Sequence, residues 1–487
     1  MNTLATRRRF LAGIGLLGGA SLLAACGGAA TTVVTTASAA TAATTAASSA
    51  ATTAAATTSS GTVTKAAKEA VTSASTAPAT AAQANGVTLQ YLGQGSADEM
   101  KIYKTLADNF HKQQPGINVQ INFSPKGGAA GIFEQLTTQV ASNAGPDVYW
   151  THSYIGAALA KSGVAEVLNP FIDQDKTLKL SDYFTASYMD YTFNGKHTAL
   201  PREIATDIMF YRTDLFDKAG VKYPDATWTW DQLATTAKQL TSTNAGITTF
   251  GYGGPVNSSF LYTSHALEDG SDIIDAQNFK SLFATDAVTQ AVQYQADFIY
   301  KDHSAPSPAD NAADKTIDFQ HGRAAIAFSG YYLISTINGN TKNTWTYDVS
   351  NMPVNTTGKR VSASATSGHS AWSGTKHPQE SWQWLKYLAG EEASKIYGAS
   401  GLVIPPLIAL ANSAEFTSSA NPPHHRKVFI DDLAVAHPFP IVPNWLDVLT
   451  AINDMLAPVF AGTKTAKEAI DAGNAKLDTL LQQNAKN

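Results

Sequence analysis

The sequence contains very little cysteine. Cys26 is the single cysteine in 487 residues, so no disulfide can form within the chain. Charged residues are also scarce, at 15% of the chain, and the formal net charge is −5. A mildly acidic chain lacks both the basic surface that binds nucleic acid and the polybasic segment that binds anionic lipid. We therefore predict no nucleic-acid partner.

Long apolar runs are missing as well. One short run ends at Ala25, and a membrane-spanning helix needs ~20 apolar residues, so this run is too short to span comfortably. The basic residues Arg7, Arg8 and Arg9 precede it, and small residues follow it. A basic head, a short apolar middle and small residues before a cut site are typical of an export signal. We predict such a signal in residues 1–25, of the twin-arginine type.

The segment around the cysteine has a pattern of its own. Leu23-Ala24-Ala25-Cys26 resembles the lipobox of bacterial lipoproteins, which implies that the signal is cut before Cys26 and that this residue is lipidated. Acyl chains contribute ~0.8 kcal/mol per buried CH₂, so several chains would anchor the protein to a membrane. The alternative is a buried structural cysteine in an N-terminal helix.

Residues 27–85 are almost wholly alanine, threonine, serine and glycine. Such a segment has too little apolar bulk to offset the entropy lost on ordering it. The many β-branched threonines also oppose a helix. We predict that residues 26–85 form a lipidated cysteine followed by a disordered linker.

The composition changes at about Gly86, and a β-α-β pattern begins. Residues 87–92 alternate apolar and polar side chains, as a strand does. Ser96 and Glu99 have the spacing of a capping box before a helical stripe. A second strand is expected at 117–123, a helix near 132–141, a strand at 147–150 and a helix from Ser153. This alternation predicts an α/β fold with a mostly parallel sheet.

Further helices carry clear start signals. Thr229 and Thr465 each begin a capping-box pattern. Residues 381–397 are amphipathic, and we expect one helix there that ends at Gly398. About 400 residues follow the linker, more than one hydrophobic core usually supports, so we predict two lobes.

Several segments together resemble the extracellular solute-binding proteins of ABC importers, in the sugar-binding family that includes the maltodextrin-binding proteins. The resemblance covers nearly all of residues 87–487. It rests on the order and spacing of these segments: Pro146-Asp147-Val148-Tyr149-Trp150, Leu200-Pro201, Tyr211 to Gly220, Thr229-Trp230-Asp231, Phe319 to Ala327, and Gly330.

The resemblance implies a two-lobed, type II periplasmic-binding-protein-like α/β fold. Residues 87–199 plus 371–421 would form lobe 1, and residues 200–370 plus 422–487 would form lobe 2. The chain would cross between the lobes near 199–202, 368–372 and 421–423. The resemblance also implies a protein outside the cytoplasm that captures a carbohydrate and delivers it to ABC transporter permease subunits. With the lipobox, we predict a monomer that is anchored to the cell membrane by lipid alone.

A carbohydrate site needs aromatic rings for the apolar faces of the sugar and hydrogen-bonding groups for its hydroxyls. Trp150 corresponds to a stacking tryptophan of the maltodextrin binders, and ordinary core packing is its alternative. Tyr332 falls at another aromatic position of the family. The expected aromatic residues of the site are Trp150, Tyr331, Tyr332, Trp372 and Trp445.

The polar candidates come from loops expected to face the cleft. Maltodextrin binders carry an Asp-Arg pair where Ser153 and Tyr154 stand, so maltodextrin itself is not implied. Ser96 and Ser153 could instead cap their helices. A surface pair of Arg202 and Glu203 would contribute little to stability. The expected polar residues are Gln94, Ser96, Ser153, Tyr154, Arg202, Glu203 and His369.

Catalytic and metal-binding motifs are missing. The chain has no HExxH motif and no Walker loop, and residues 368–372 lack the last glycine of an esterase G-x-S-x-G turn. Adjacent His424 and His425 point apart on most backbones, so we predict no metal, no cofactor and no catalytic residue. Two carboxylates facing across a gap cannot be recognised from sequence, so a secreted carbohydrate-active hydrolase stays an alternative. The same fold binding a polyol, glycerol phosphate or another small solute is a second one.

Overall fold

The computed structural model describes residues 86–254, 257–339, 344–418 and 421–484. The predicted export signal in 1–25, Cys26 and the linker in 26–85 lie outside the described residues. Within the described ranges, no helix combines the length and the apolar character that a bilayer span requires.

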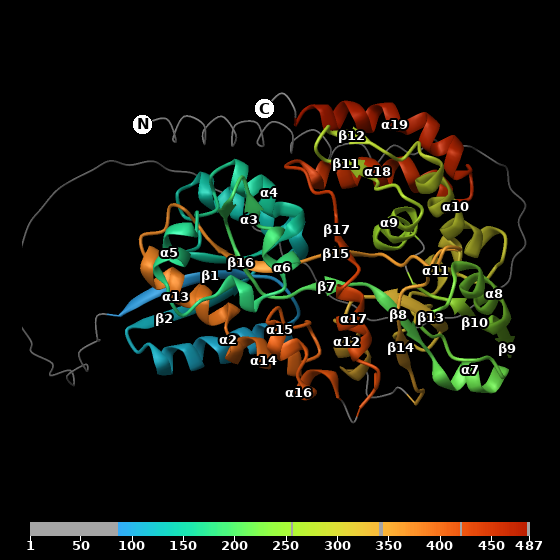
Figure 1. Cartoon of the computed structure of the whole chain (residues 1–487), viewed down its shortest axis with the longest axis horizontal. Coiled ribbons are helices and arrows are strands. Elements are labelled where there is room, and N and C mark those ends of the chain that lie inside the picture. Colours follow the sequence, from blue (N-terminus) through green and yellow to red (C-terminus); the bar gives the residue numbers. More distant parts are fainter. Residues whose placement is uncertain (1–85, 255–256, 340–343, 419–420, 485–487) are drawn as a thin grey trace, which may run out of the picture. The chain divides into compact units, whose positions relative to one another are not determined.

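The first sheet has the strand order β2-β1-β3-β16-β6. Its strands β1, β2 and β16 are labelled in Figure 1. Its first three strands are parallel, and β16 runs antiparallel to both β3 and β6. Helices α2, α3, α4, α13 and α14 pack around it. The bounds are β1 Val87–Gly93, β2 Ile117–Phe123, β3 Val148–His152, β6 Leu200–Pro201, β16 Ser367–Ala371, α2 Ala97–Gln113, α3 Gly128–Ala141, α4 Ser153–Lys161, α13 Pro378–Ala389 and α14 Glu391–Ala399.

The local signals explain these elements. Leu89 and Tyr91 of β1 are fully buried, as the alternating pattern predicts. The Ser96 hydroxyl accepts from the Glu99 amide at 3.2 Å, and the Glu99 carboxylate accepts from the Ser96 amide at 3.3 Å. The predicted capping box of α2 is therefore confirmed, and so are the α/β class and the parallel start of the sheet.

The second sheet has the order β14-β8-β13-β10-β9. Strands β13 and β10 are parallel, and the other neighbouring pairs are antiparallel. Thr229 caps α8 with a complete capping box, as predicted. The bounds are β8 Ile208–Tyr211, β9 Ser242–Asn244, β10 Ile247–Tyr252, β13 Ala324–Ser329, β14 Asp348–Ser350, α7 Thr213–Ala219, α8 Trp230–Leu240, α9 Ser259–Glu268, α10 Asp286–Tyr300, α12 Leu333–Gly339 and α17 Lys427–Leu433.

Two chain segments run directly from one sheet toward the other. Strand β6 continues into β7 (Ala205–Thr206), and β15 (Ser362–Ala365) continues into β16. Strands β7 and β15 pair antiparallel in a small sheet that also contains β17 (Ala436–Pro438). The two segments are thus hydrogen-bonded to each other on both sides of residues 202–204.

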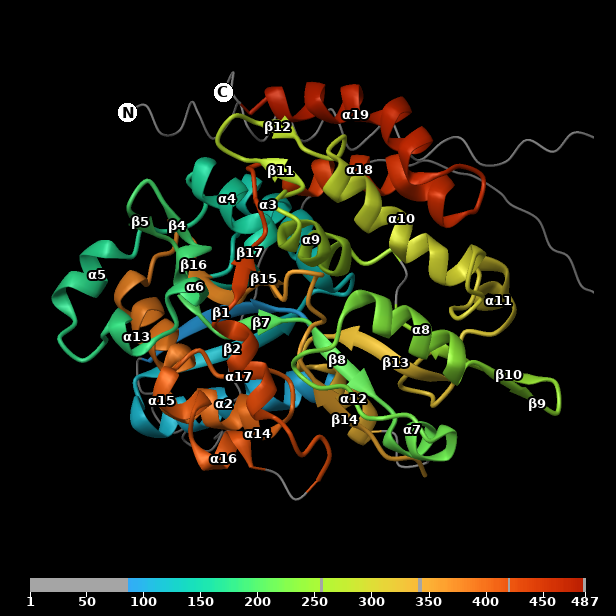
Figure 2. The same cartoon turned by 45° about the vertical axis from the view of Figure 1, so that its right-hand side comes forward.

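The C-terminal part of the chain forms a helical pair beside α10 (Figure 2). Helices α18 (Trp445–Phe460) and α19 (Ala466–Gln482) bury their apolar faces in one core cluster with α10. Thr465 caps α19 with the predicted capping box. The remaining short elements are α5 Asn169–Gln174, α6 Thr185–Met189, α11 Pro308–Ala313, α15 Ile408–Ala411, α16 Ala414–Thr417, the 3₁₀ turn Leu180–Asp182, and the strand pairs Thr192–Phe193 with Lys196–His197 and Ile274–Asp275 with Lys280–Ser281.

One helix expected from the sequence is two helices in the structure. The predicted segment 381–397 is broken at Gly390, which ends α13 and begins α14 in an extended conformation. A Cβ at this glycine would stand 3.2 Å from two carbonyl oxygens of the preceding turn. The amphipathic pattern continues across the break because both helices bury their apolar side against the first sheet.

The cores indicate where the two halves divide. The core residues from Ala371 to Val403 pack with the first sheet. Ile404, Ala411 and Phe416 pack instead with Phe210 of the second sheet. The lobe limits 87–199 plus 371–421 and 200–370 plus 422–487, and the three crossings, stay predictions.

Candidate functional site

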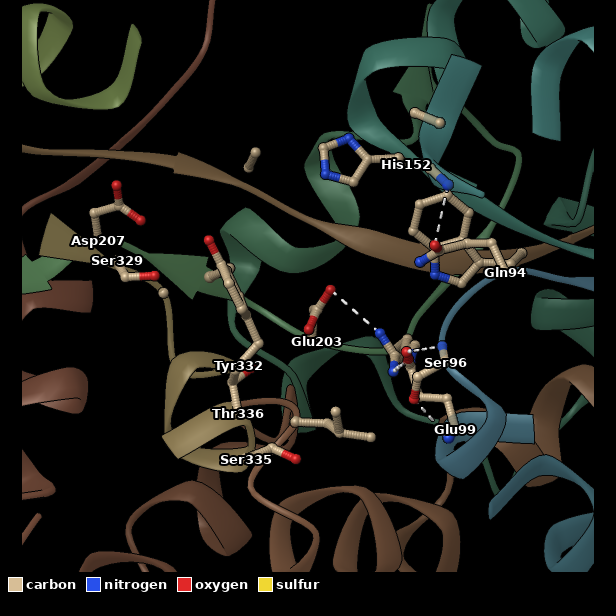
Figure 3. Close-up of a pocket in the computed structure, with 18 of the residues that line it drawn as sticks. Gln94, Ser96, Glu99, His152, Glu203, Asp207, Ser329, Tyr332, Ser335 and Thr336 are labelled. Carbon is tan, nitrogen blue, oxygen red and sulfur yellow. Dashed lines mark hydrogen bonds and ion pairs between the residues drawn. The ribbon is translucent and has the colours of Figure 1, made fainter. Parts of the chain in front are cut away.

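A cavity of about 940 Å³ opens between the ends of the two sheets (Figure 3). The first sheet contributes the loop after β1 and the end of β3, and the second contributes the loops around β8 and β13. Seven of the residues expected at the site line it, and they are Gln94, Ser96, Trp150, Tyr154, Arg202, Glu203 and Tyr332. The sequence therefore predicted residues on both sides of one cavity.

Arg202 is the central cation of the cavity. Its side chain is only 5% exposed, and its Nη2 donates to Oε1 of Glu99 at 2.8 Å. Its Nη1 lies 3.5 Å from Oε1 of Glu203. The guanidinium also stacks over the ring of Tyr397, 5.0 Å from the centroid. This pair is not the solvated surface pair expected from the sequence, because burial removes the water that would screen it.

Glu99 connects the start of α2 to this cation. One of its carboxylate oxygens completes the capping box, and the other accepts from Arg202. A single side chain thus serves both the helix end and the charge centre. Ser96 caps the helix and also lies exposed at the cavity edge.

Glu203 is held on the other side of Arg202. Its carboxylate accepts from the hydroxyl of Ser367, the first residue of β16. Burial raises the pKa of Glu203, although Arg202 and the hydrogen bond from Ser367 oppose this shift. The carboxylate is therefore fixed at the point where the chain passes between the sheets.

Gln94 and His152 provide neutral hydrogen-bonding groups on the first sheet. The side-chain oxygen of Gln94 accepts from the Gly128 amide at 3.1 Å. Nδ1 of His152 accepts from the Tyr154 amide at 3.2 Å, so the Nε2 of the neutral ring carries the proton and can donate. Burial lowers the pKa of His152 to about 4, which keeps the ring neutral near pH 7.

Among the described residues, five tryptophan, tyrosine and phenylalanine side chains line the cavity. Trp150 is only 4% exposed, whereas Tyr332 is 57% exposed and lies across the cavity from Gln94 (Figure 3). Trp150 belongs to the core of the first sheet as well as to the cavity wall. The aromatic set is Trp150, Tyr154, Phe260, Phe328 and Tyr332.

Asp207 is an acidic side chain in the cavity that was not expected from the sequence. It lies between β7 and β8, on the same side of the cavity as Tyr332 (Figure 3). Its carboxylate makes no hydrogen bond or ion pair with any described residue, and burial raises its pKa to about 7. A carboxylate that faces a cavity without a partner is a candidate ligand-binding group.

Five of the expected residues do not line the cavity. Ser153 is buried as the first residue of α4, and the cap is His152 rather than Ser153. His369 is fully buried, and its Nδ1 lies 3.2 Å from the Tyr91 hydroxyl. The other three expected residues are aromatic and lie buried in core clusters; they are Tyr331, Trp372 and Trp445. We do not retain these five in the proposed site, because their side chains are used in packing.

The sequence signal for the missed residues was present only in part. Glu99 was recognised as a capping residue, and its second role follows from a contact with a residue 103 positions away. Asp207 follows a two-residue strand, which no periodic pattern reveals. Among the residues that the structure describes, no group of three or more His, Cys, Asp or Glu side chains could hold a metal ion.

Solved structures share this fold. An ABC substrate-binding protein from Listeria monocytogenes in complex with cycloalternan has a TM-score of 0.73 and 21% identity, covering 81% of this chain and 99% of that one. The maltose-bound MalE3 of T. maritima has a TM-score of 0.69 and 21% identity, with the same coverage. The fold is therefore the two-lobed α/β fold of solute-binding proteins, as predicted.

The sequence comparisons agree with the fold. A protein of Brucella abortus (strain 2308) that is named only as a binding protein is 22% identical over 395 residues, which are 80% of this chain and 92% of that protein. The family model of the bacterial extracellular solute-binding proteins matches residues 93–395, more than half of the chain. The chain belongs to this family, and the predicted resemblance is confirmed.

Proposed function

We propose that this protein is a lipid-anchored receptor outside the cytoplasm that captures a carbohydrate and delivers it to the permease of an ABC transporter. The observation that carries the proposal is the cavity between the two sheets, in which aromatic rings and hydrogen-bonding side chains face each other. The cavity does not suggest a reaction, because the groups around Arg202 are held in mutual hydrogen bonds and ion pairs.

The chemistry of the lining supports a carbohydrate. The exposed ring of Tyr332 offers a flat surface for the C–H face of a sugar, and Trp150 forms part of the opposite wall. Gln94 and His152 offer neutral hydrogen-bonding groups, and Glu203 offers a charged acceptor, which forms stronger hydrogen bonds than a neutral one. The Listeria and T. maritima proteins were solved with cycloalternan and maltose, which is consistent with this class of ligand.

The cavity volume supports a ligand of more than one sugar ring. Small-molecule sites commonly measure ~300–1,000 Å³, and this cavity of about 940 Å³ lies at the upper end. We therefore propose an oligosaccharide as the ligand. Bending of the segments that connect the sheets would close the two lobes over it.

The sequence supports the anchoring part of the proposal. The basic head, the apolar run and the lipobox end at Cys26, and the family is one of extracellular proteins. A receptor on a long tether could stay at the membrane surface and still reorient toward a permease. We propose that it acts as a monomer and has no catalytic activity.

The test is a thermal-shift screen of the purified chain against mono- and oligosaccharides. A ligand that binds only the folded state adds about 2.7 kcal/mol to the free energy of unfolding at a hundredfold excess over Kd. We expect at least one oligosaccharide to raise the melting temperature. Stabilisation by none of them would contradict the proposal. New reducing ends after incubation with the stabilising sugar would instead identify a hydrolase.

A further inference from the structure

The cavity has an excess of negative charge. Arg202 is its lining cation, and it is already paired with Glu99 and Glu203. Asp98 at the edge is neutralised by Lys101 at 2.7 Å. Asp207 is left without a counter-charge among the described residues. The charges that line the cavity therefore do not balance.

Asp207 also makes no ion pair with Arg202, whose guanidinium contacts Glu99 and Glu203 instead. Burial raises the pKa of Asp207 to about 7. Burial and, after it, the charge of Asp207 raise the pKa values of Tyr154, Tyr252 and Tyr332, which come from α4, β10 and the loop after β13. Glu203 interacts with Tyr332 as well and adds negative charge on that side. None of these groups is a cation.

We propose that the cavity selects a carbohydrate that carries a protonated amine, and that the Asp207 carboxylate binds this amine. The inference rests on the proposed carbohydrate-binding function and specifies its ligand class. The half-buried Asp207 carboxylate faces the cavity without a protein partner, and an ammonium group on a ligand would supply the opposite charge and the hydrogen-bond donors together. A sugar hydroxyl supplies only a donor, and an anionic sugar would be repelled.

The pocket is arranged so that one ligand could satisfy both sides. Tyr332 lies beside Asp207 on the second sheet, while Gln94 lies opposite on the first (Figure 3). An amine at Asp207 would place its sugar ring beside the exposed face of Tyr332. The hydroxyls farther along the ligand would then face Gln94 and His152.

Binding measurements with three probes test the inference: a glucosamine trimer, an N-acetylglucosamine trimer and maltotriose. The first carries amines, the second the same rings with neutral amides, and the third only hydroxyls. We expect the full-length protein to bind the glucosamine trimer about tenfold more tightly than the acetylated trimer, since a charged hydrogen bond contributes about 1.5–3 kcal/mol. Asp207→Asn should remove this preference.

A matched control is Asp108→Asn, which changes an exposed aspartate of α2 outside the cavity. We expect it to bind all three probes like the wild type. Equal affinity of the wild type for both trimers, or an unchanged preference in Asp207→Asn, would overturn the inference. If maltotriose still binds in that case, the proposed function stands without it. If no probe binds, the inference fails, and the thermal-shift screen alone decides the proposed carbohydrate-binding function.

The pH dependence of the wild type provides a second test that needs no variant. The amines of a glucosamine oligomer are weaker bases than a lysine amine and stay mostly protonated from about pH 5 to about pH 6, while the ionised fraction of the Asp207 carboxylate, with a pKa of about 7, rises about tenfold over the same interval. We expect affinity for the glucosamine trimer to rise severalfold over this interval and affinity for maltotriose to change little. A flat profile for the amine-bearing probe would contradict the role of Asp207.

Discussion

At the scale of single residues, the buried guanidinium of Arg202 controls the site. It lies between Glu99 and Glu203, stacks on Tyr397, and its side chain is 5% exposed. Removing one member of a buried charge group leaves the others uncompensated, which costs far more than the group contributes when complete. The arrangement is therefore stable as a unit and sensitive to any single replacement.

We expect Arg202→Met to lower the free energy of unfolding by about 3–5 kcal/mol, because Glu99 and Glu203 would remain buried without a cation. Urea denaturation measures this change. Lys101→Met is the matched control, since it breaks an exposed pair with Asp98 that water screens, and the free energy of unfolding should change far less than in Arg202→Met. Similar decreases in the free energy of unfolding of the two variants would show that the buried charges around Arg202 contribute no more to stability than an exposed ion pair.

Asp207, unlike the Arg202 ion-pair group, lowers the stability of the ligand-free protein when it is ionised. Its pKa is about 7 in the folded protein and near the ordinary aspartate value when unfolded, so the folded state binds its proton more tightly. The group therefore stabilises the ligand-free protein at low pH relative to high pH, and that contribution is lost as the pH rises from about 4 to about 7.

We expect Asp207→Asn to raise the melting temperature of the ligand-free protein at about pH 8 and to change it little at about pH 4. The amide needs no proton and carries no charge, so the pH-dependent penalty disappears. Melting curves of both proteins across this range measure the difference. A variant that is less stable than the wild type at high pH would contradict an unpartnered carboxylate at this position.

Glu99 has one role that could be predicted from the sequence and one that could not. Its capping role follows from a spacing of three residues, which the sequence displays directly. Its ion pair with Arg202 joins positions 103 residues apart, and only the folded chain brings them together. The family motifs predicted the positions of Trp150 and Tyr332 at the cavity. The burial of His369, Trp372 and Trp445 depends on tertiary packing, which those motifs do not reveal.

At the scale of secondary-structure elements, the sequence predicted those with strong local signals. Strand β2 coincides with the expected range 117–123, and α2, α8 and α19 begin at their predicted caps. The break at Gly390 was missed because the apolar pattern continues through it. The two-residue strands β6 and β7 were missed because they are too short to show a period.

The helix cap of α2 provides a test at this scale. Ser96→Ala and Thr465→Ala each remove a capping hydroxyl, and each should lower the free energy of unfolding by about 1 kcal/mol. Only Ser96→Ala should also weaken ligand binding, since the Glu99 of its capping box holds Arg202 in the cavity. Calorimetric titration with the ligand measures the affinity of each variant. Equal affinities of Ser96→Ala and Thr465→Ala would show that the cap of α2 does not contribute to ligand binding.

At the scale of the whole molecule, the sequence was informative about class and less so about boundaries. The α/β alternation and the family motifs predicted the two-lobed fold, which the structure and the comparisons confirm. The point at which the C-terminal half changes sides could not be derived, because Val403 and Ile404 are adjacent apolar residues that pack in different cores. Hydrophobicity alone does not say which core a residue enters.

The proposed lipid anchor at Cys26 leads to a prediction for the whole chain. We expect Cys26→Ser to move the protein from the membrane fraction to the soluble fraction, because a serine cannot carry the lipid. Its affinity for the ligand should equal that of the wild type, since the cavity lies far along the sequence from the cysteine. Fractionation followed by titration measures both quantities, and a changed affinity would argue against a purely anchoring role.

The paired segments between the two sheets have a mechanical consequence. Leu200 and Pro201 are bonded to β16 on one side, and Ala205 and Thr206 are bonded to β15 on the other. The segment β6–β7 and the segment β15–β16 are therefore held together by backbone hydrogen bonds at both ends. Neither segment can slide along the other unless several of these hydrogen bonds break together. A two-stranded ribbon of this kind bends easily perpendicular to its plane and resists sliding of one strand past the other. It would therefore restrict the relative motion of the two sheets to rotation about a single hinge axis.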